Sequence, residues 1–173
     1  MRKLFLLFTL ALFSGCATTP PLSTSKDTLF DVSGRIGVRH GNQGFSGSMR
    51  WIHKTAGDEL WLLSPIGQTV AHITRNSQGA VLSTSDRKEY RAADVGGLTE
   101  KVLGWHLPLS GLDSWIMGKP FPESPSGAIP GEDEFVQNGW DIRYEKRFEN
   151  GHPKVMVLER PGLRIKLIVN PNE

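Results

Sequence analysis

Most of this chain alternates between apolar and polar residues with a period of two, which is the pattern of half-buried β-strands. In residues 29–39, for example, Val32 and Ile36 alternate with Asp31 and Arg35. Because successive side chains of a strand point to opposite faces, one face of each segment is buried and the other is solvated. Similar segments lie at residues 45–51, 59–63, 69–74, 80–83, 89–91, 134–137, 140–145, 154–159 and 163–169.

Turn residues separate these segments and predict that consecutive strands form hairpins. Gly41 to Gly44 is a turn that follows the first segment. Asn138-Gly139 joins two later segments, and this residue pair is the strongest short hairpin signal. The chain has no repeated crossover of strand and helix, so we expect an antiparallel, strongly curved sheet.

The period then changes, and two short helices interrupt the strands. Val95, Leu98 and Val102 have helical spacing. Asp94 and Gly104 flank them and are residue types that begin and end helices. The second helix follows Pro108 and carries the apolar residues Leu109, Leu112, Trp115 and Ile116. We expect the two helices to cover an open face or mouth of the curved sheet.

The first fifteen residues have the features of a signal peptide. Arg2 and Lys3 form a positively charged start, and a largely apolar stretch follows at residues 4–13. This stretch is too short to cross a bilayer as a stable helix, which takes about 20 residues. Small residues then lead to Cys16, which is the only cysteine of the chain. We therefore assign residues 1–15 to a signal peptide.

Cys16 stands where bacterial lipoproteins carry their lipidated cysteine, and the residues before it resemble a lipobox. In this interpretation the cysteine carries three acyl chains, and two or more chains make a stable anchor. Ala17 follows it, which favours sorting to the outer membrane by the rule of enteric bacteria. Residues 16–28 then comprise the anchor and a flexible, polar tether, and residues 29–173 form the domain. The alternative is an ordinary signal peptide with an unmodified cysteine.

The charge balance argues against nucleic-acid binding. The chain has 20 Lys and Arg against 18 Asp and Glu, and both surplus cations lie in the signal peptide, as Arg2 and Lys3. The rest of the chain is neutral, whereas a nucleic-acid backbone requires clustered positive charge. A single cysteine also excludes an internal disulfide framework and a Cys-rich metal site.

A search for catalytic motifs finds little support for an enzyme. None of the five histidines has another at a spacing of three or four residues, so we expect no metal site. The segment Gly44 to Gly47 resembles a nucleophile elbow only in part and lies in a predicted hairpin. Two matches to Ser-x-x-Lys lie in the tether and in a turn. Residue spacing does not exclude a pair of catalytic carboxylates, so a lipid-anchored hydrolase or cell-wall enzyme stays open as an alternative.

Five segments resemble the LolB family, the outer-membrane lipoprotein receptors of Gram-negative bacteria. The most specific is Leu107–Gly118, in which Pro108 precedes the pattern Leu-x-x-Leu-x-x-Trp-Ile-x-Gly. The other four are Gly34–Ile36, Ser64–Gly67, Tyr90–Asp94 and Arg164–Leu167. The similarity extends over nearly the whole chain.

This resemblance implies both a fold and a function. The fold is mostly β with a minor helical part, an incomplete antiparallel β-barrel that short helices close around a hydrophobic cavity. The function is to accept the acyl chains of lipoproteins from the periplasmic carrier LolA and to insert them into the outer membrane. The protein would be a monomer without enzymatic activity or cofactor, anchored in the outer membrane and facing the periplasm.

The resemblance also implies a site in two parts. In the family, a loop presents an apolar residue that helps insert lipid into the bilayer, and Pro65, Ile66 and Gly67 form that loop here, with Ile66 where Leu is usual. We select as cavity residues, from alternation and helix faces, Ile36, Val38, Met49, Trp51, Leu60, Leu62, Leu98, Val102, Leu112, Trp115, Ile116, Ile142, Tyr144, Ile165 and Leu167. Alternation does not distinguish an inward face from an outward one, so ordinary core packing is the alternative for each.

Three functions stay open on the sequence, and they predict different interiors. A lipid-handling receptor predicts an apolar cavity without convergent polar groups. A hydrolase predicts a cleft with two titratable groups within hydrogen-bond reach of each other. A purely scaffolding lipoprotein predicts a filled barrel.

Overall fold

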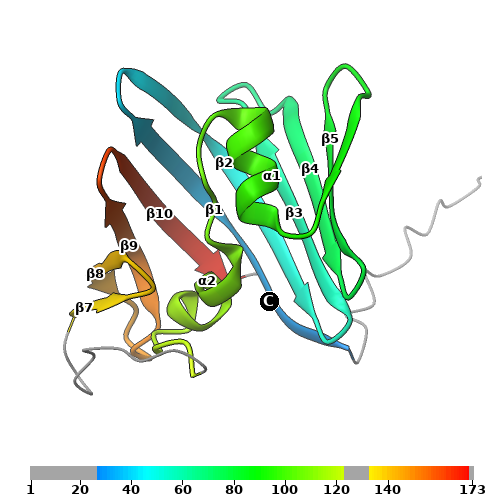
Figure 1. Cartoon of the computed structure of the whole chain (residues 1–173). Helices are drawn as coiled ribbons and strands as arrows, with labels where there is room; N and C mark the ends of the chain where they lie inside the picture. Colours follow the sequence, from blue (N-terminus) through cyan, green and yellow to red (C-terminus); the bar gives the residue numbers. More distant parts are fainter. Residues whose placement is uncertain (1–26, 123–132, 172–173) are drawn as a thin grey trace, which may run out of the picture.

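The computed structural model describes residues 27–122 and 133–171, which form one open, curved sheet with two helices on one face (Figure 1). The strands are β1 (Thr28–His40), β2 (Gln43–Lys54), β3 (Gly57–Leu63), β4 (Thr69–Asn76), β5 (Gly79–Thr84), β6 (Glu89–Ala92), β7 (Glu134–Gln137), β8 (Trp140–Arg147), β9 (Pro153–Arg160) and β10 (Leu163–Pro171). The helices are α1 (Val95–Leu103) and α2 (Leu109–Ile116). The strand segments and both helices predicted from the sequence are therefore present.

The ten strands of the described residues pair in the order β6-β5-β4-β3-β2-β1-β10-β9-β8-β7. All neighbouring pairs are antiparallel. The first and last strands, β1 and β10, pair at the centre of the sheet, while β6 and β7 are its edges. Since the two edges do not pair with each other, the barrel is incomplete, as predicted.

Local turn chemistry produces this order of strands. Asn138 and Gly139 have φ angles of 53° and 75°, and they join β7 to β8 where Gln137 pairs with Trp140. Positive φ at both central residues is the requirement of a type I′ turn, whose twist matches that of the flanking strands. The predicted hairpin at Asn138-Gly139 is confirmed.

Helix α1 begins and ends at the predicted residues. The carboxylate of Asp94 accepts a hydrogen bond from the backbone N–H of Gly97 at 2.8 Å. Gly104 ends the helix in the left-handed conformation, with a φ of 82°, and its N–H donates to the carbonyl of Glu100 at 3.1 Å. Both ends therefore have partners for backbone groups that a helix terminus leaves unpaired.

Helix α2 is present but kinked in its first turn. Ser110 and Gly111 have non-helical backbone angles, and Gly111 has a φ of 102°. An ideal Cβ at Gly111 would lie 3.0 Å from the indole ring of Trp115. Two constraints therefore require glycine at this position, namely the positive φ and the close approach of the ring.

The core lies between the curved sheet and the two helices. Alternate residues of the strands enter it, for example Ile36 and Val38 of β1 and Leu60 and Leu62 of β3. Helix α1 contacts β5 and β6. Helix α2 is held to the strands at the other edge through Trp115, which is hydrogen-bonded to side chains of β7 and β8. The helices thus cover the apolar face near its two open edges.

A buried carboxylate joins three strands at one end of the sheet. Asp58 of β3 is 3% exposed, and the Nε1 of Trp51 donates to its Oδ1 at 2.8 Å. The Nδ1 of His53 lies 2.7 Å from the same oxygen, and the Nε of Arg75 donates to Oδ2 at 2.6 Å. Because a buried charge is costly without partners, this network favours one register of β2, β3 and β4.

Two glycines of β1 differ in the space around them. An ideal Cβ at Gly34 would lie 2.0 Å from the carbonyl oxygen of Ile168 on β10, whereas one at Gly37 would meet no atom within 4 Å. Gly34 therefore allows a close approach of the two central strands. Nothing in the packing requires glycine at position 37.

We expect Gly34→Ala to lower the free energy of unfolding by about 1–3 kcal/mol, because the added methyl group must displace the backbone of β10. Gly37→Ala is the matched control on the same strand and should change it by less than about 0.5 kcal/mol. Denaturant titration of the two variants measures the difference. Equal effects would contradict the close approach as the reason for glycine at position 34.

Candidate apolar binding site and loop tip

The structure places the predicted cavity residues in one apolar interior under the helices. Those that are buried in the core cluster are Ile36, Val38, Met49, Trp51, Leu60, Leu62, Leu98, Leu112, Trp115, Ile116, Ile142, Tyr144, Ile165 and Leu167. Val102 is partly buried and packs against the same cluster. These side chains therefore lie together, and their contact with a lipid stays a prediction.

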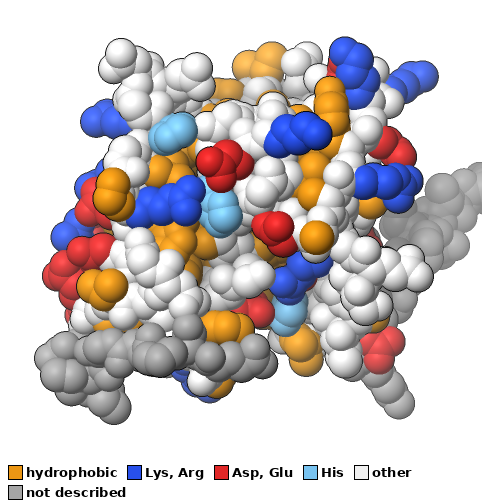
Figure 2. Space-filling model, viewed as in Figure 1, with side chains coloured by type: hydrophobic (Ala, Val, Ile, Leu, Met, Phe, Trp, Pro, Cys, Tyr) orange, Lys and Arg blue, Asp and Glu red, His pale blue; other side chains and the backbone are white. Residues whose placement is uncertain are grey.

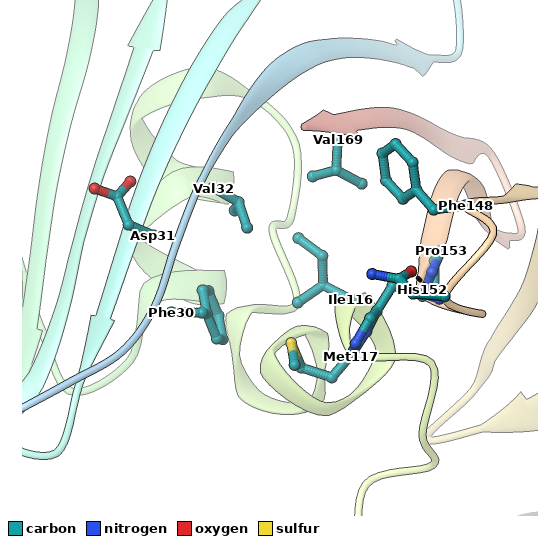
Figure 3. Close-up of a pocket in the computed structure, with 10 residues that line it drawn as sticks. Phe30, Asp31, Val32, Ile116, Met117, Phe148, His152, Pro153 and Val169 are labelled. Atoms are coloured by element: carbon teal, nitrogen blue, oxygen red, sulfur yellow. Dashed lines mark hydrogen bonds between the residues drawn. The ribbon is translucent and has the colours of Figure 1, made fainter. Parts of the chain in front are cut away.

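A pocket of about 270 Å³ lies at the edge of this interior, beside the end of α2 (Figure 3). Its lining residues are Phe30, Asp31, Val32, Ile116, Met117, Phe148, Asn150, His152, Pro153 and Val169. In Figure 3, Phe30 and Val32 extend from β1 on the side of α2, whereas the carboxylate of Asp31 points away on the other side of the strand. That carboxylate lies 2.8 Å from the guanidinium of Arg50. The pocket wall is mostly apolar, as a hydrocarbon ligand requires.

Of the predicted cavity residues, Ile116 lines this pocket. Phe30, Val32 and Val169 also line it, and they lie on the same alternating faces as predicted residues, so the sequence contained a signal for them. Phe148 comes from the turn between β8 and β9, and Pro153 begins β9 directly after that turn. That turn has no periodic pattern, and only the folded chain brings it beside α2.

A buried amide side chain holds α2 and the segment after it. Gln137 of β7 is 1% exposed, and its Oε1 accepts from the Nε1 of Trp115 and from the N–H of Phe121, both at 2.7 Å. Its Nε2 donates to the carbonyl of Phe121 at 2.8 Å. The hydroxyl of Tyr144 donates to the carbonyl of Trp115 at 2.9 Å. Burial raises the pKa of this phenol, so it stays protonated and remains a donor.

Ile66 lies at the tip of the turn between β3 and β4. The N–H of Gly67 donates to the carbonyl of Ser64 at 2.9 Å, and the N–H of Ser64 donates to the carbonyl of Gln68 at 2.8 Å. Pro65, Ile66 and Gly67 therefore form a three-residue hairpin loop, which requires a left-handed residue in its last position. Gly67 supplies it with a φ of 82°, and the side chain of Ile66 is 78% exposed. Insertion of this side chain into a bilayer stays a prediction.

The loop tip and the pocket lie toward opposite ends of the sheet. The strand register aligns Thr28 with Lys54, and Lys54 with Gly57 at the start of β3. Ile66 follows the far end of β3, whereas Phe30 of the pocket lies near the start of β1. The loop tip and the pocket are therefore two separate features of the domain.

The two titratable side chains that line the pocket, Asp31 and His152, do not meet (Figure 3). Asp31 pairs with Arg50 on the other face of the sheet. Within residues 27–122 and 133–171, no group of three His, Cys, Asp or Glu side chains could hold a metal ion. Figure 2 shows the helix-covered face, where acidic, basic and hydrophobic side chains are interspersed.

Comparison with known proteins identifies the family. Residues 28–171 match the family model described as outer membrane lipoprotein LolB. The chain belongs to the LolB family of outer-membrane lipoproteins. It is 36% identical to the outer-membrane lipoprotein LolB of Chromobacterium violaceum, over 98% of this chain and 97% of that protein. It is also 36% identical to LolB of Thiobacillus denitrificans, again over 98% and 97% of the two chains.

A solved structure of a LolA superfamily protein from Nitrosomonas europaea resembles this LolB-family chain with a TM-score of 0.47. It has 10% sequence identity and covers 84% of this chain and 85% of that one. LolB of the same organism is 35% identical over 82% of this chain and 71% of that protein. The family assignment depends on these sequence matches and on the family model.

The anchor of this LolB-family protein falls on residues that the structure does not describe. Cys16, the signal peptide at 1–15 and the tether at 16–28 lie outside the described residues, apart from the tether's last two positions. No helix within the described part of the chain is long and apolar enough to cross a membrane. The division into signal peptide, tether and domain therefore stays a prediction.

We expect Gln137→Ala to lower the free energy of unfolding by about 1–3 kcal/mol, because the buried N–H of Trp115 loses its acceptor. It should also speed amide hydrogen exchange in residues 109–121, which the wild-type amide holds to β7. Gln68→Ala, at the exposed end of the β3–β4 turn, is the control and should change neither quantity. Unchanged exchange in Gln137→Ala would show that other contacts hold α2.

Proposed function

We propose that this LolB-family protein accepts the acyl chains of lipoproteins from the periplasmic carrier LolA and inserts them into the outer membrane. The observation that carries this proposal is the apolar interior, which is formed by one face of an open sheet and covered by two short helices. Family membership supports the same function. The protein acts as a monomer, with its domain facing the periplasm and its lipid in the outer membrane.

The energetics of acyl chains explain why such an interior is needed. Each CH₂ group moved from water into an apolar environment contributes about 0.8 kcal/mol, so an acyl chain does not cross the periplasm in water. A chain instead passes from one apolar cavity to another and then to the bilayer. The direction is set by affinities that increase along this route. No bond is made or broken, so the step requires neither a cofactor nor a catalytic residue.

The size of the pocket indicates that the cover moves when cargo enters. Its volume of about 270 Å³ is just below the roughly 300–1,000 Å³ of typical ligand pockets, so it holds part of an acyl chain. The remainder of the chain must enter the space under α2. The hydrogen bonds of Gln137 and Tyr144 to Trp115 are buried polar contacts that hold this helix to the strands. We infer that α2 moves away from the sheet during loading.

The length of the tether lets anchor and loop tip reach one bilayer. Thr28 lies twelve positions after Cys16, and this length of chain spans at most about 40 Å when extended. The seven residues of β3, which separate the two ends of the sheet, span about 23 Å. The domain can therefore turn its Ile66 end toward the membrane that holds its lipid, although the tether joins the opposite end.

A hydrolase is the second function that the sequence leaves open, and the observed site does not favour it. The pocket lining combines apolar side chains with Asp31, Asn150 and His152. Asp31 is paired with Arg50 on the outer face. A general acid and base would have to lie within hydrogen-bond reach of one reacting group, and these side chains do not meet.

The direct test mixes the protein with the carrier LolA loaded with a tagged lipoprotein and follows the tag. We expect the lipoprotein to move to this protein and, when liposomes are present, into their bilayers. No movement from a folded protein with its matched carrier would contradict the receptor function. Release of a modified lipoprotein would support the enzyme instead.

We expect Ile66→Glu to reduce delivery into liposomes by about 10–100-fold, because burying an isoleucine side chain contributes about 1.5–3 kcal/mol and burying a carboxylate opposes insertion. Acceptance of the lipoprotein from the carrier should be unchanged, since the pocket lies toward the other end of the sheet. Ile66→Leu should deliver normally. Gln78→Glu, at the exposed β4–β5 turn on the opposite end of the sheet, is the control for an added charge. Normal delivery by Ile66→Glu would remove the role of the loop and leave the receptor function standing.

We expect Met117→Asp to weaken binding of a fluorescent fatty acid by about 10-fold or more, because it places a charge in the apolar wall beside α2. Val136→Asp is the matched control, since Val136 is 58% exposed and does not line the pocket. Fluorescence titration compares the two variants. Equal affinities would show that the fatty acid binds elsewhere.

A further inference from the structure

Four cations gather on the outer face of the sheet, opposite the helices. Arg35 and Arg39 belong to β1, and Arg164 and Lys166 belong to β10. The strand register aligns Arg39 directly with Arg164, and Gly37 with Lys166. Residues paired in this way share a face of the sheet, so the four side chains form one cluster, here called the cationic cluster.

The acidic neighbours of the cationic cluster neutralise only its β10 side. Glu145 lies 2.6 Å from Lys166 and 3.8 Å from Arg164, and Glu159 also pairs with Arg164. Arg35 and Arg39 are exposed, and neither side chain makes an ion pair or hydrogen bond with another residue of the described chain. The cluster thus carries two uncompensated positive charges.

The alignment of Arg39 with Arg164 is unfavourable by itself. Like charges directly opposite each other on neighbouring strands destabilise a sheet. An anion bound between the two guanidinium groups would replace this repulsion with attraction, because arginine forms strong hydrogen bonds with the oxygens of a phosphate. An arrangement that is unfavourable in the free protein is therefore favourable when an anion is bound.

The surface at the cluster has room for such a group. An open depression of about 420 Å³ is lined by Gly37, Val38, Arg39, Phe45, Arg164 and Lys166. Above Gly37 the space is empty, since a Cβ there would meet no atom within 4 Å. Glycine at this position is not required by packing, and its missing side chain leaves the arginines around it accessible.

The cationic cluster lies at the same end of the sheet as the Ile66 tip. The register aligns Arg35 with Ser48 on β2, and Ser48 with Leu63 on β3. Leu63 is the last residue before the loop that carries Ile66. Neighbouring strands are about 4.8 Å apart, so Arg35 lies roughly 10 Å across the sheet from Leu63. The rest of the cluster extends from Arg35 toward the β1–β2 turn, which is at the same end.

We propose that the cationic cluster binds the phosphate groups of anionic phospholipids at the surface of the bilayer that Ile66 enters. An apolar tip flanked by arginine and lysine is the combination that an anionic membrane surface attracts. An acidic protein would fit the charges but gives no reason for an exposed isoleucine beside them. The inference rests on the proposed function only in supposing that this end of the domain faces the membrane.

The test uses the full chain held in vesicles by its own lipid, so that attachment does not depend on the cluster. A nitroxide on Ser46→Cys, which is exposed and aligned with Gly37, reports access of a water-soluble relaxation agent. We expect access to be about 5-fold or more lower in phosphatidylethanolamine vesicles with a minor fraction of phosphatidylglycerol than in vesicles of phosphatidylethanolamine and phosphatidylcholine. Added salt should restore it, since the Debye length is about 8 Å at 0.15 M.

The double variant Arg35→Gln/Arg39→Gln should remove this protection, because each basic residue near an anionic surface strengthens binding by about fivefold. Both side chains lack partners in the described chain, so we expect their replacement to leave the fold unchanged. Lys54→Gln/Lys119→Gln is the control. It also removes two cations, but Lys54 is aligned with Thr28 at the opposite end of the sheet and Lys119 follows α2 near the pocket, so this variant should keep the protection.

Three results would overturn the proposal. The first is equal protection on neutral and anionic vesicles, or in the arginine double variant. The second is loss of protection on addition of inorganic phosphate at constant ionic strength, which would indicate a site for free phosphate. The third is a double variant that keeps its lipid protection but no longer accepts cargo from the carrier, which would assign the cluster to a protein partner. Only the third result requires carrier and cargo. The measurements of protection on vesicles require neither, so they stand even if the receptor function fails.

Discussion

The structure depends on one requirement, that the apolar face of an open ten-stranded sheet be covered. A closed barrel would meet it by pairing the edge strands β6 and β7. Here α1 and α2 cover the face instead, with α1 against β5 and β6 and α2 hydrogen-bonded to β7 and β8. Helices attach through side chains, whereas paired strands attach through a ladder of backbone hydrogen bonds. This difference makes the cover the part of the interior that can be displaced.

The buried polar contacts of the described residues differ between the sheet and the two helices that cover it. In the sheet, Asp58 binds Trp51, His53 and Arg75 and joins three strands. In the cover, the hydroxyl of Thr99 accepts from the N–H of Leu107 at 3.0 Å and ties α1 to the connection that follows it. A buried hydrogen bond contributes only about 0.5–1.5 kcal/mol net, so a lipid that buries many CH₂ groups can offset the loss of several.

The two ends of the sheet have different surfaces. One end has the pocket and the start of β1, where the tether joins. The other has the exposed Ile66 and the cationic cluster around Gly37. The net charge does not reveal this asymmetry, because the 18 cations beyond the signal peptide balance the 18 acids. Net charge reports on the whole chain, while a membrane responds to the charges within about one Debye length of its surface.

By itself, the sequence determined the strands, the turns and the caps of α1, because each depends on residues close together in the chain. Alternation around Ile36, the Asn138-Gly139 turn and the Asp94 cap are local effects of this kind. The family motifs likewise located Ile66 in a loop. The tertiary structure alone decided which turn lies beside α2, that Gln137 is the partner of Trp115, and that Arg39 faces Arg164. These contacts join residues 22 to more than 100 positions apart, and no local pattern encodes the register and curvature that bring them together.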